Sequence, residues 1–397
     1  MSSVLEISRK INKAWKEDVL TDGSIIPECP RIPLGTLGAD FPLFGGVPLK
    51  QITVFAGLEH SGKTLAACQV MAEYQKMFPD NTCIYVDAEG AFGAQKSFLT
   101  KMTGLIIDDP SKFLRYDCSG KSGEEIFEDI IQLQQADNIG LIILDSAPAL
   151  VSQADIDNPF TKDNGQRASI AKSLGKFLKQ MIMYLPKRNN ALIIINQVRE
   201  AGVTFTGAKI YTEPCGYALK YYPSMKVRFG TRTFTQGDKT DISGSKGDDA
   251  DGFRLKCSIT KNRLGPTNRG GGFLTYRYDS GLDTIGDLLE VALKYEFIRR
   301  PTTQSYELIN LDTGEIYSDS EGNTLKFVGK AKLIDFINNN PDFREQYVDM
   351  LNRNISSASN GRSLLDEETM KEIMDQEASV EGNLSAEEKA EKEAVNE

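Results

Sequence analysis

The chain has 397 residues, of which 40% are hydrophobic and 26% charged, and its formal net charge is −10. This composition is ordinary for a globular protein, and no apolar run approaches the roughly 20 residues that a membrane span needs. The six scattered cysteines form no CxxC pair and His60 is the single histidine, which argues against disulfides and excludes a multi-histidine metal site. The polar N-terminus lacks the apolar core of a secretory signal, so we expect a cytoplasmic protein without membrane contact.

The N-terminal segment, residues 1–34, predicts a short helix followed by a linker. Val4, Ile7, Ile11 and Trp15 recur at helical spacing, and three prolines follow by residue 33. A single helix of this length is marginal in water, so it should pack on its own core or on a neighbouring protomer. We expect this segment to be a contact between protomers.

Residues 35–282 predict an α/β core. Continuous apolar runs, typical of parallel strands covered on both faces, alternate with helical stretches. The strands are expected at 51–56, 83–87, 141–145 and 191–196, and the helices at 63–76, 124–136 and 169–185. Further strands are expected at 226–233, 253–262 and 272–278, with a mobile hairpin loop at 235–252. The pattern therefore indicates a mostly parallel central sheet.

A small α+β domain is expected at 283–352, beginning with a helix at 284–296 and ending with helices at 329–338 and 342–351. Residues 353–397 follow as an acidic tail. By count, 361–397 hold twelve acidic and four basic side chains, so most of the net negative charge lies there. Such a composition predicts disorder, with at most a transient helix near its start, and leaves a near-neutral body that can carry a basic DNA-facing stripe.

The strongest local motif has the pattern GxxxxGK[ST] between a predicted strand and a predicted helix. It reads Gly57-Leu58-Glu59-His60-Ser61-Gly62-Lys63-Thr64, with Leu65 next in the helix. Backbone N–H groups of such a loop converge on phosphates, the lysine reaches the β- and γ-phosphates, and the hydroxyl ligates Mg²⁺. The motif predicts ATP and Mg²⁺ as ligands, and we interpret His60 as a variable loop position rather than a catalytic base.

Polar residues end three further predicted strands, where a parallel sheet places its ligand crevice. Asp145 follows four apolar residues and is the expected second metal ligand, although an aspartate here could also cap a helix. Glu89 is the candidate general base, and Asp87 is interpreted as structural. Asn196 and Gln197 place two amides at a strand end, and such an amide is a candidate γ-phosphate sensor because a long polar loop follows that a phosphate could order.

These motifs, in this order and spacing, resemble those of the RecA family from about residue 33 to 352. The matching segments are Gly57–Thr64, Asp87-Ala88-Glu89, Leu144-Asp145-Ser146, Asn196-Gln197-Val198-Arg199 and Thr260-Lys261-Asn262-Arg263. The resemblance implies a RecA-like P-loop ATPase core. Departures from the bacterial pattern and the acidic tail make the chain more similar to a phage-encoded, UvsX-like recombinase, which would act in the host cytoplasm.

The resemblance also implies residue roles. Lys63, Thr64, Glu89 and Asp145 would act within one protomer, and Gln197 would couple the γ-phosphate to DNA. Lys261 and Arg263 would reach the ATP of the adjacent protomer, as an arginine finger does. Phe98 would stack on adenine in place of a tyrosine. Two loops, 151–167 and 198–220, would bind DNA, with candidate phosphate contacts at Arg167, Lys172, Arg199, Lys209 and Lys220; a solvated surface charge is the alternative for each.

The expected activity is DNA-dependent ATP hydrolysis by a recombinase that forms a helical homo-oligomeric filament on single-stranded DNA and pairs it with a homologous duplex. A single-strand-binding or mediator protein is an expected partner. Two alternatives remain: a RecA-fold hexameric DNA motor or helicase, which would close into rings, and a non-catalytic recombination mediator. Intact Lys63, Glu89 and Asp145 argue against the second alternative.

Overall fold

The computed structural model describes residues 3–25, 29–157, 167–203, 209–237, 239–242, 249–265, 267, 270–310, 313–318, 322–358, 365 and 367–394. It divides into two compact units, residues 1–30 and 31–397. The first unit contains the predicted N-terminal helix as α1 (Val4–Trp15), whose capping box is formed by Ser3 and Glu6. No residue of α1 is buried within this unit. Its expected contact with another protomer stays a prediction.

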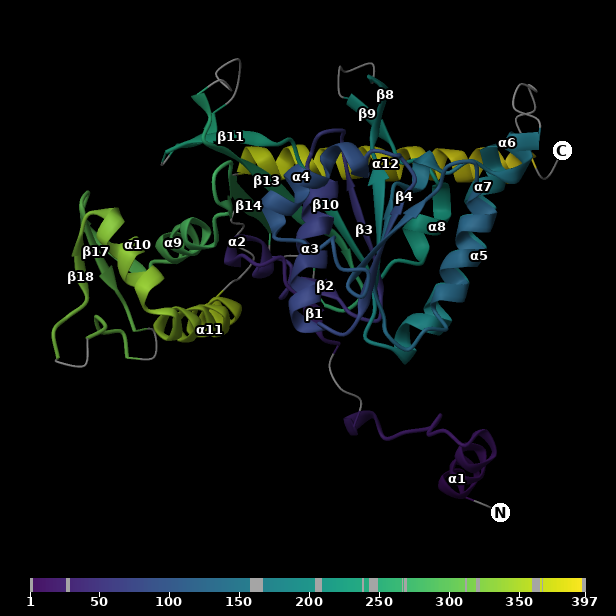
Figure 1. Ribbon diagram of the computed structural model, residues 1–397, viewed down its shortest axis with the longest axis horizontal. Helices are drawn as coiled ribbons and strands as arrows, with labels where there is room; N and C mark the ends of the chain where they lie inside the picture. The colour runs from purple at the N-terminus through teal and green to yellow at the C-terminus, as the bar shows by residue number, and fades with distance from the viewer. Residues whose placement is uncertain are drawn as a thin grey trace. The chain divides into compact units, whose positions relative to one another are not determined.

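The second unit is built on one large sheet (Figure 1), in which eleven of the described strands pair. The central five strands run parallel in the order β3-β7-β6-β4-β5, and β10 extends them in parallel beside β3. Their bounds are β3 (Ile52–Gly57), β4 (Thr82–Asp87), β5 (Phe113–Asp117), β6 (Ile139–Asp145), β7 (Leu192–Gln197) and β10 (Met225–Phe229). The predicted α/β class with a mostly parallel sheet is confirmed.

Antiparallel strands continue the sheet beyond β10. They are β11 (Thr233–Gln236), β12 (Lys239–Ile242), β13 (Gly252–Asn262), β14 (Gly271–Arg277) and β15 (Gly281–Leu282). The loop expected at 235–252 therefore includes two strands, and its residues 238 and 243–248 lie outside the described residues.

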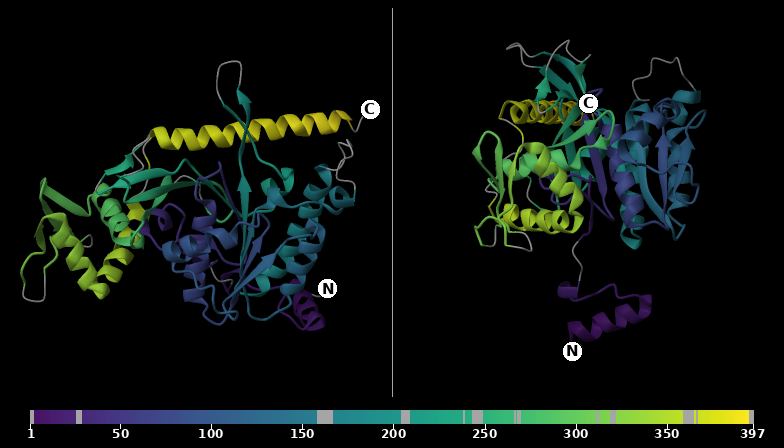
Figure 2. Two further views of the ribbon diagram at one scale, coloured as in Figure 1. Left: turned by 45° about the horizontal axis from the view of Figure 1, so that its top comes forward. Right: turned by 60° about the vertical axis from the view of Figure 1, so that its left-hand side comes forward.

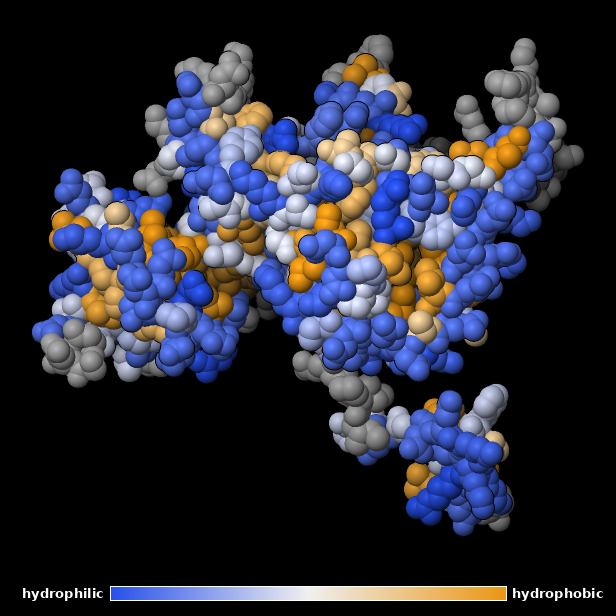
Figure 3. Space-filling model, in the orientation of Figure 1, coloured by the Kyte–Doolittle hydropathy of each residue, from blue (hydrophilic) through white to orange (hydrophobic). Residues whose placement is uncertain are grey.

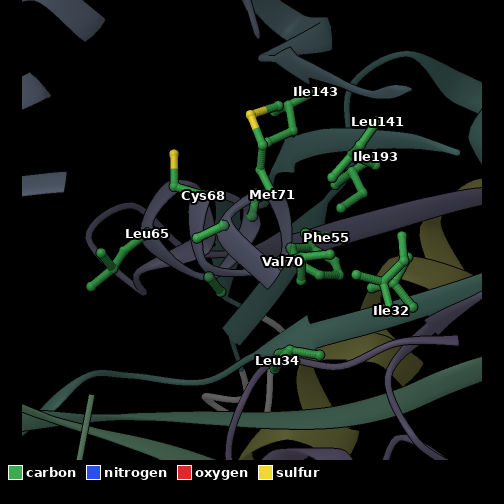
Figure 4. Packing of buried hydrophobic residues seen from close by; sticks show 14 of the residues in the cluster. Ile32, Leu34, Phe55, Leu65, Cys68, Val70, Met71, Leu141, Ile143 and Ile193 are labelled. Atoms are coloured by element: carbon green, nitrogen blue, oxygen red, sulfur yellow. The ribbon is translucent and has the colours of Figure 1, made fainter. Parts of the chain in front are cut away.

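Helices cover both faces of the sheet because alternate strand residues point to opposite sides. On one face α3 (Lys63–Met77) and α4 (Phe92–Thr103) pack on residues such as Phe55 and Ile143. On the other face, α5 (Gly123–Leu133) and α7 (Arg167–Tyr184) pack on Val54 and Ile142, the strand residues that directly precede Phe55 and Ile143. Figure 4 shows Val70 and Met71 of α3 among Phe55, Leu141 and Ile193. In Figure 3 the surface over α5 and α7 is mostly hydrophilic.

Shorter elements complete the core, and a small module follows it. The core elements are β1 (Arg31–Ile32), α2 (Leu37–Asp40), β2 (Val47–Pro48), α6 (Gln153–Asp157) and α8 (Gly216–Tyr221). The module consists of α9 (Thr284–Lys294), β16 (Ile298–Thr302), β17 (Ser305–Leu308), β18 (Lys326–Val328), α10 (Lys330–Asn339) and α11 (Pro341–Ala358). Its strands form a separate antiparallel sheet, and its helices share one apolar cluster with those strands. Among the described residues, no helix combines the length and the hydropathy of a membrane span.

The acidic tail differs from expectation, because residues 367–394 form the helix α12 (Glu367–Ala394). Thr369, Ile373, Gln376 and Val380 recur at helical spacing, and all four are buried. Figure 2 shows α12 lying along the body of the second unit, and its side chains Ile373 and Val380 join two apolar clusters of that body. The prediction of disorder was wrong for this segment because two of the four buried side chains are polar, so composition alone conceals the packed face.

Candidate nucleotide and DNA site

The P-loop connects β3 to α3 at the carboxyl edge of the sheet. The backbone must pass close to its neighbours here, because a Cβ on Gly57 would lie 2.6 Å from the Phe229 carbonyl oxygen. Gly62 precedes α3 with φ +85°, and a Cβ there would lie 2.3 Å from Leu255. Glycine is therefore required at both positions. The structure places a strand, a tight loop and a helix N-terminus together, as phosphate binding needs.

Lys63 is the buried cation of this loop. Its side chain lies inward, and Nζ donates hydrogen bonds to the Leu58 carbonyl oxygen at 2.7 Å and to Ser61 Oγ at 3.4 Å. Burial lowers the pKa of Lys63 to about 8, partly opposed by Asp145 and Glu89. A phosphate at the loop would favour the charged ammonium, so the lysine is poised to bind an anion.

The expected metal ligands lie together. Thr64 Oγ1 donates a hydrogen bond to Asp145 Oδ2 at 2.7 Å, and Tyr85 Oη donates to the same oxygen at 2.6 Å. Burial raises the pKa of Asp145 to about 6. A hydroxyl and a carboxylate suit Mg²⁺, which also keeps waters and phosphate oxygens as ligands. Tyr85 was not predicted, since a tyrosine in an apolar strand carries no separate signal.

Glu89 lies two residues beyond the end of β4, and its carboxylate forms hydrogen bonds with residues at the ends of β6 and β7. Its Oε1 accepts hydrogen bonds from Ser146 Oγ at 2.5 Å and from Gln197 Nε2 at 2.7 Å. Gln197 ends β7 and is followed two residues later by Arg199, the first residue of β8. The candidate base and the candidate phosphate sensor are therefore in direct contact.

Asp87 has a structural environment. It is buried, accepts a hydrogen bond from the Ala91 backbone N–H at 3.1 Å, and pairs with Arg115 at 2.7 Å. It thus ties the start of α4 to β5 and leaves Glu89 as the exposed acid of the pair.

One pocket of about 250 Å³ collects most of the predicted nucleotide residues. Lys63, Thr64, Glu89, Asp145 and Gln197 line it at the strand ends. The other residues that line it are Glu59, His60, Gly62, Leu65, Gln95, Phe98, Leu99, Ile195, Arg232, Phe253 and Leu255. Gly57, Leu58 and Ser61 shape the loop behind it. His60 is exposed, and its Nε2 lies 3.7 Å from Glu59 Oε1.

Lys261 and Arg263 lie at the end of β13 and do not line this pocket. Lys261 Nζ donates to the carbonyl oxygens of Lys220 at 2.5 Å and Tyr221 at 3.2 Å, at the end of α8. Burial, with Arg263 and Lys226 nearby, lowers the pKa of Lys261 to about 8. Within one chain these two residues are therefore separate from the predicted nucleotide residues, and their expected contact with the ATP of an adjacent protomer stays a prediction.

The candidate DNA residues fall on different elements. The second predicted loop is a hairpin, β8 (Arg199–Val203) with β9 (Lys209–Thr212), whereas residues 204–208 lie outside the described residues. Arg199 and Lys209 are exposed on it, and Lys209 Nζ lies 2.7 Å from Glu200. Lys172 is exposed on α7, and Lys220 belongs to α8. Arg167 begins α7, but its side chain is outside the described part, as are residues 158–166 of the first loop.

The helix α12 lies against the hairpin and the strands beside it. Ser379 Oγ donates to the Lys209 carbonyl oxygen at 3.1 Å and accepts from the Tyr211 backbone N–H at 3.2 Å. Glu377 pairs with Lys226 at 2.9 Å and with the fully buried Arg228. Burial alone would raise the pKa of Glu377, but Arg228 and Lys226 hold it below its usual value. The tail is therefore an ordered neighbour of the candidate DNA surface.

Comparisons with known proteins identify the family of the chain. Residues 6–282 match the RecA N-terminal domain family. The chain is 32% identical to "Protein RecA" of Thermus aquaticus over 66% of this chain and 71% of that protein. It is 30% identical to "Protein RecA" of Rickettsia prowazekii, with 71% and 77% covered, and 31% identical to that of Thermus thermophilus, with 72% and 78% covered.

Proposed function

Because this chain belongs to the RecA family, we propose that it is an ATP-dependent recombinase that binds single-stranded DNA and exchanges strands with a homologous duplex in recombination and repair. It hydrolyses ATP in a DNA-dependent manner, uses Mg²⁺, and acts as a helical filament in the cytoplasm. The contact between Glu89 and Gln197 carries the proposal, because it links the hydrolysis site directly to the DNA hairpin.

Glu89 acts as the general base for the attacking water, and Gln197 responds to the γ-phosphate. The Gln197 amide can donate either to Glu89 or to a phosphate oxygen. Donation to phosphate frees the carboxylate to accept a proton from water. The same movement is transmitted to Arg199 and the hairpin, because Gln197 lies two residues before the first residue of β8.

Thr64 and Asp145 would hold Mg²⁺, which neutralises charge on the transferring phosphoryl group when bound. Lys63 orients the β- and γ-phosphates from the floor of the loop. Lys261 and Arg263 supply positive charge to the nucleotide of the next protomer, so that hydrolysis depends on assembly.

DNA binding depends mainly on phosphate contacts. Arg199 and Lys209 lie exposed on the hairpin and Lys172 on α7. The pair between Lys209 and Glu200 is solvent-exposed, so a DNA phosphate can replace the glutamate at little cost. Binding should be independent of base sequence and should weaken steeply with salt.

Electron microscopy of the full chain with single-stranded DNA and a non-hydrolysable ATP analogue tests the proposal, together with ATP turnover measured with and without DNA. We expect open helical filaments and turnover that DNA stimulates. Closed rings would favour the hexameric motor. Isolated particles with unstimulated turnover would contradict the recombinase.

Deleting residues 361–397 should strengthen binding to single-stranded DNA severalfold at low salt. The deletion removes most of the net negative charge and uncovers the hairpin backbone that Ser379 contacts. The gain should shrink at high salt because ions screen the removed repulsion. Fluorescence anisotropy with a labelled oligothymidylate at two salt concentrations measures both effects.

A charge-only control separates repulsion from docking. Glu367→Gln with Glu368→Gln removes two exposed charges from α12 without shortening the chain, so it should give only a fraction of the gain. Equal or weaker DNA binding by the shortened protein at matched salt would contradict the prediction.

A further inference from the structure

The nucleotide pocket is lined by a basic residue that lies outside the P-loop, the metal site and the hairpin. Arg232 lies in the segment between β10 and β11, is exposed, and lines the same pocket as Lys63 and Phe98. This segment starts beside the P-loop, because Phe229 at the end of β10 pairs with Gly57. A lone arginine in a polar connection gives no signal in the sequence.

The Arg232 guanidinium rests on aromatic rings. Its central carbon lies 5.2 Å from the ring centre of Phe253 and 5.6 Å from that of Phe234. Phe253 is itself buried and stacked on Tyr276, with ring centres 5.4 Å apart. Rings at this distance attract the cation. The guanidinium therefore lies beside the aromatic part of the pocket lining.

The pocket has two kinds of lining. Lys63, Thr64 and Asp145 are the polar residues expected to bind the triphosphate and its metal. Phe98, Leu99, Phe253 and Leu255 supply the apolar wall, and Arg232 borders that wall through Phe253. The uncharged part of a nucleotide fits this wall, since bases bind on apolar surfaces and a guanidinium plane can stack on a base.

We propose that Arg232 binds the nucleoside of the bound nucleotide, stacking its guanidinium on the base beside Phe98, and thereby sets a preference for purine nucleotides. The inference rests on the proposed ATPase function. A purine presents a larger ring face than a pyrimidine, so it gains more from a planar cation.

Calorimetric titration of full-length Arg232→Gln with ATP, CTP and inorganic tripolyphosphate, each with Mg²⁺, tests the assignment. We expect affinity for ATP to fall about tenfold, affinity for CTP to fall about threefold or less, and affinity for tripolyphosphate to stay unchanged. Arg232→Lys should resemble Arg232→Gln, because an ammonium lacks the plane. Arg300→Gln is the matched control, since Arg300 lies 5.2 Å from the ring centre of Tyr306 in the small module.

Two outcomes would overturn the inference. Equal losses of affinity for ATP, CTP and tripolyphosphate would mean that Arg232 acts on the phosphates or on folding. Unchanged affinity for ATP would mean that Arg232 does not contribute to nucleotide binding. Wild-type protein that fails to bind Mg²⁺-ATP would contradict the proposed function itself.

Discussion

Lys63→Ala should reduce ATP turnover by about 10³-fold or more, both with and without DNA. Lys63 is 6% exposed, and its ammonium donates to the Leu58 carbonyl oxygen and to Ser61 within its own loop. Arg232 also lines the pocket but lies outside this loop, so we expect that it does not replace the ammonium at the β- and γ-phosphates. Burial lowers its pKa to about 8, so the ammonium of Lys63 stays mostly charged at neutral pH and can bind the phosphates directly. Phosphate release at saturating ATP measures the effect.

Lys76→Ala is the control for this variant. Lys76 lies in the last turn of the same helix and makes an exposed pair with Glu73 at 2.8 Å. It should retain wild-type turnover, since such surface pairs contribute little. Turnover by Lys63→Ala within a few-fold of wild type would remove the P-loop from the mechanism.

Lys261→Ala should lower DNA-stimulated turnover by about 10³-fold or more while affinity for Mg²⁺-ATP changes less than about twofold. Within one chain Lys261 contacts the end of α8 and not the pocket, so losing it should leave nucleotide binding intact. The exposed Lys332→Ala on α10 should behave as wild type.

A mixing experiment distinguishes action across protomers from support of α8. Lys261→Ala and Glu89→Gln should each be inactive alone, but together they should form interfaces that contain one intact Glu89 and one intact Lys261. We expect the mixture to regain a measurable share of turnover. Recovery no greater than the sum of the two separate proteins would show that Lys261 acts only within its own chain.

Elements with a strong local pattern could be predicted from sequence. The strand, loop and helix around Lys63 follow from an apolar run, glycine spacing and a helical continuation. The helix expected at 124–136 is α5, and a capping box of Ser122 and Glu125 marks its start. These features depend on residues close in sequence, so no tertiary information was needed.

Elements with a weak local pattern were missed. Strand β5 buries only Phe113 among its five residues, so no apolar run marks it. The hairpin of β8 and β9 is mostly exposed and was expected to be an irregular loop. The site was predicted as a set of strand ends, but the contact between Glu89 and Gln197 depends on the order in which distant strands pair.

The docked helix α12 determines the net charge of the surface on which it packs. Beneath α12, two cations, Lys226 and Arg228, meet two carboxylates, Glu213 and Glu377, and only Glu377 belongs to the helix. With the helix seated, the four formal charges cancel. If the helix dissociates, one positive charge remains in excess on the strand surface. The same movement therefore exposes this surface and makes it attractive to polyanions.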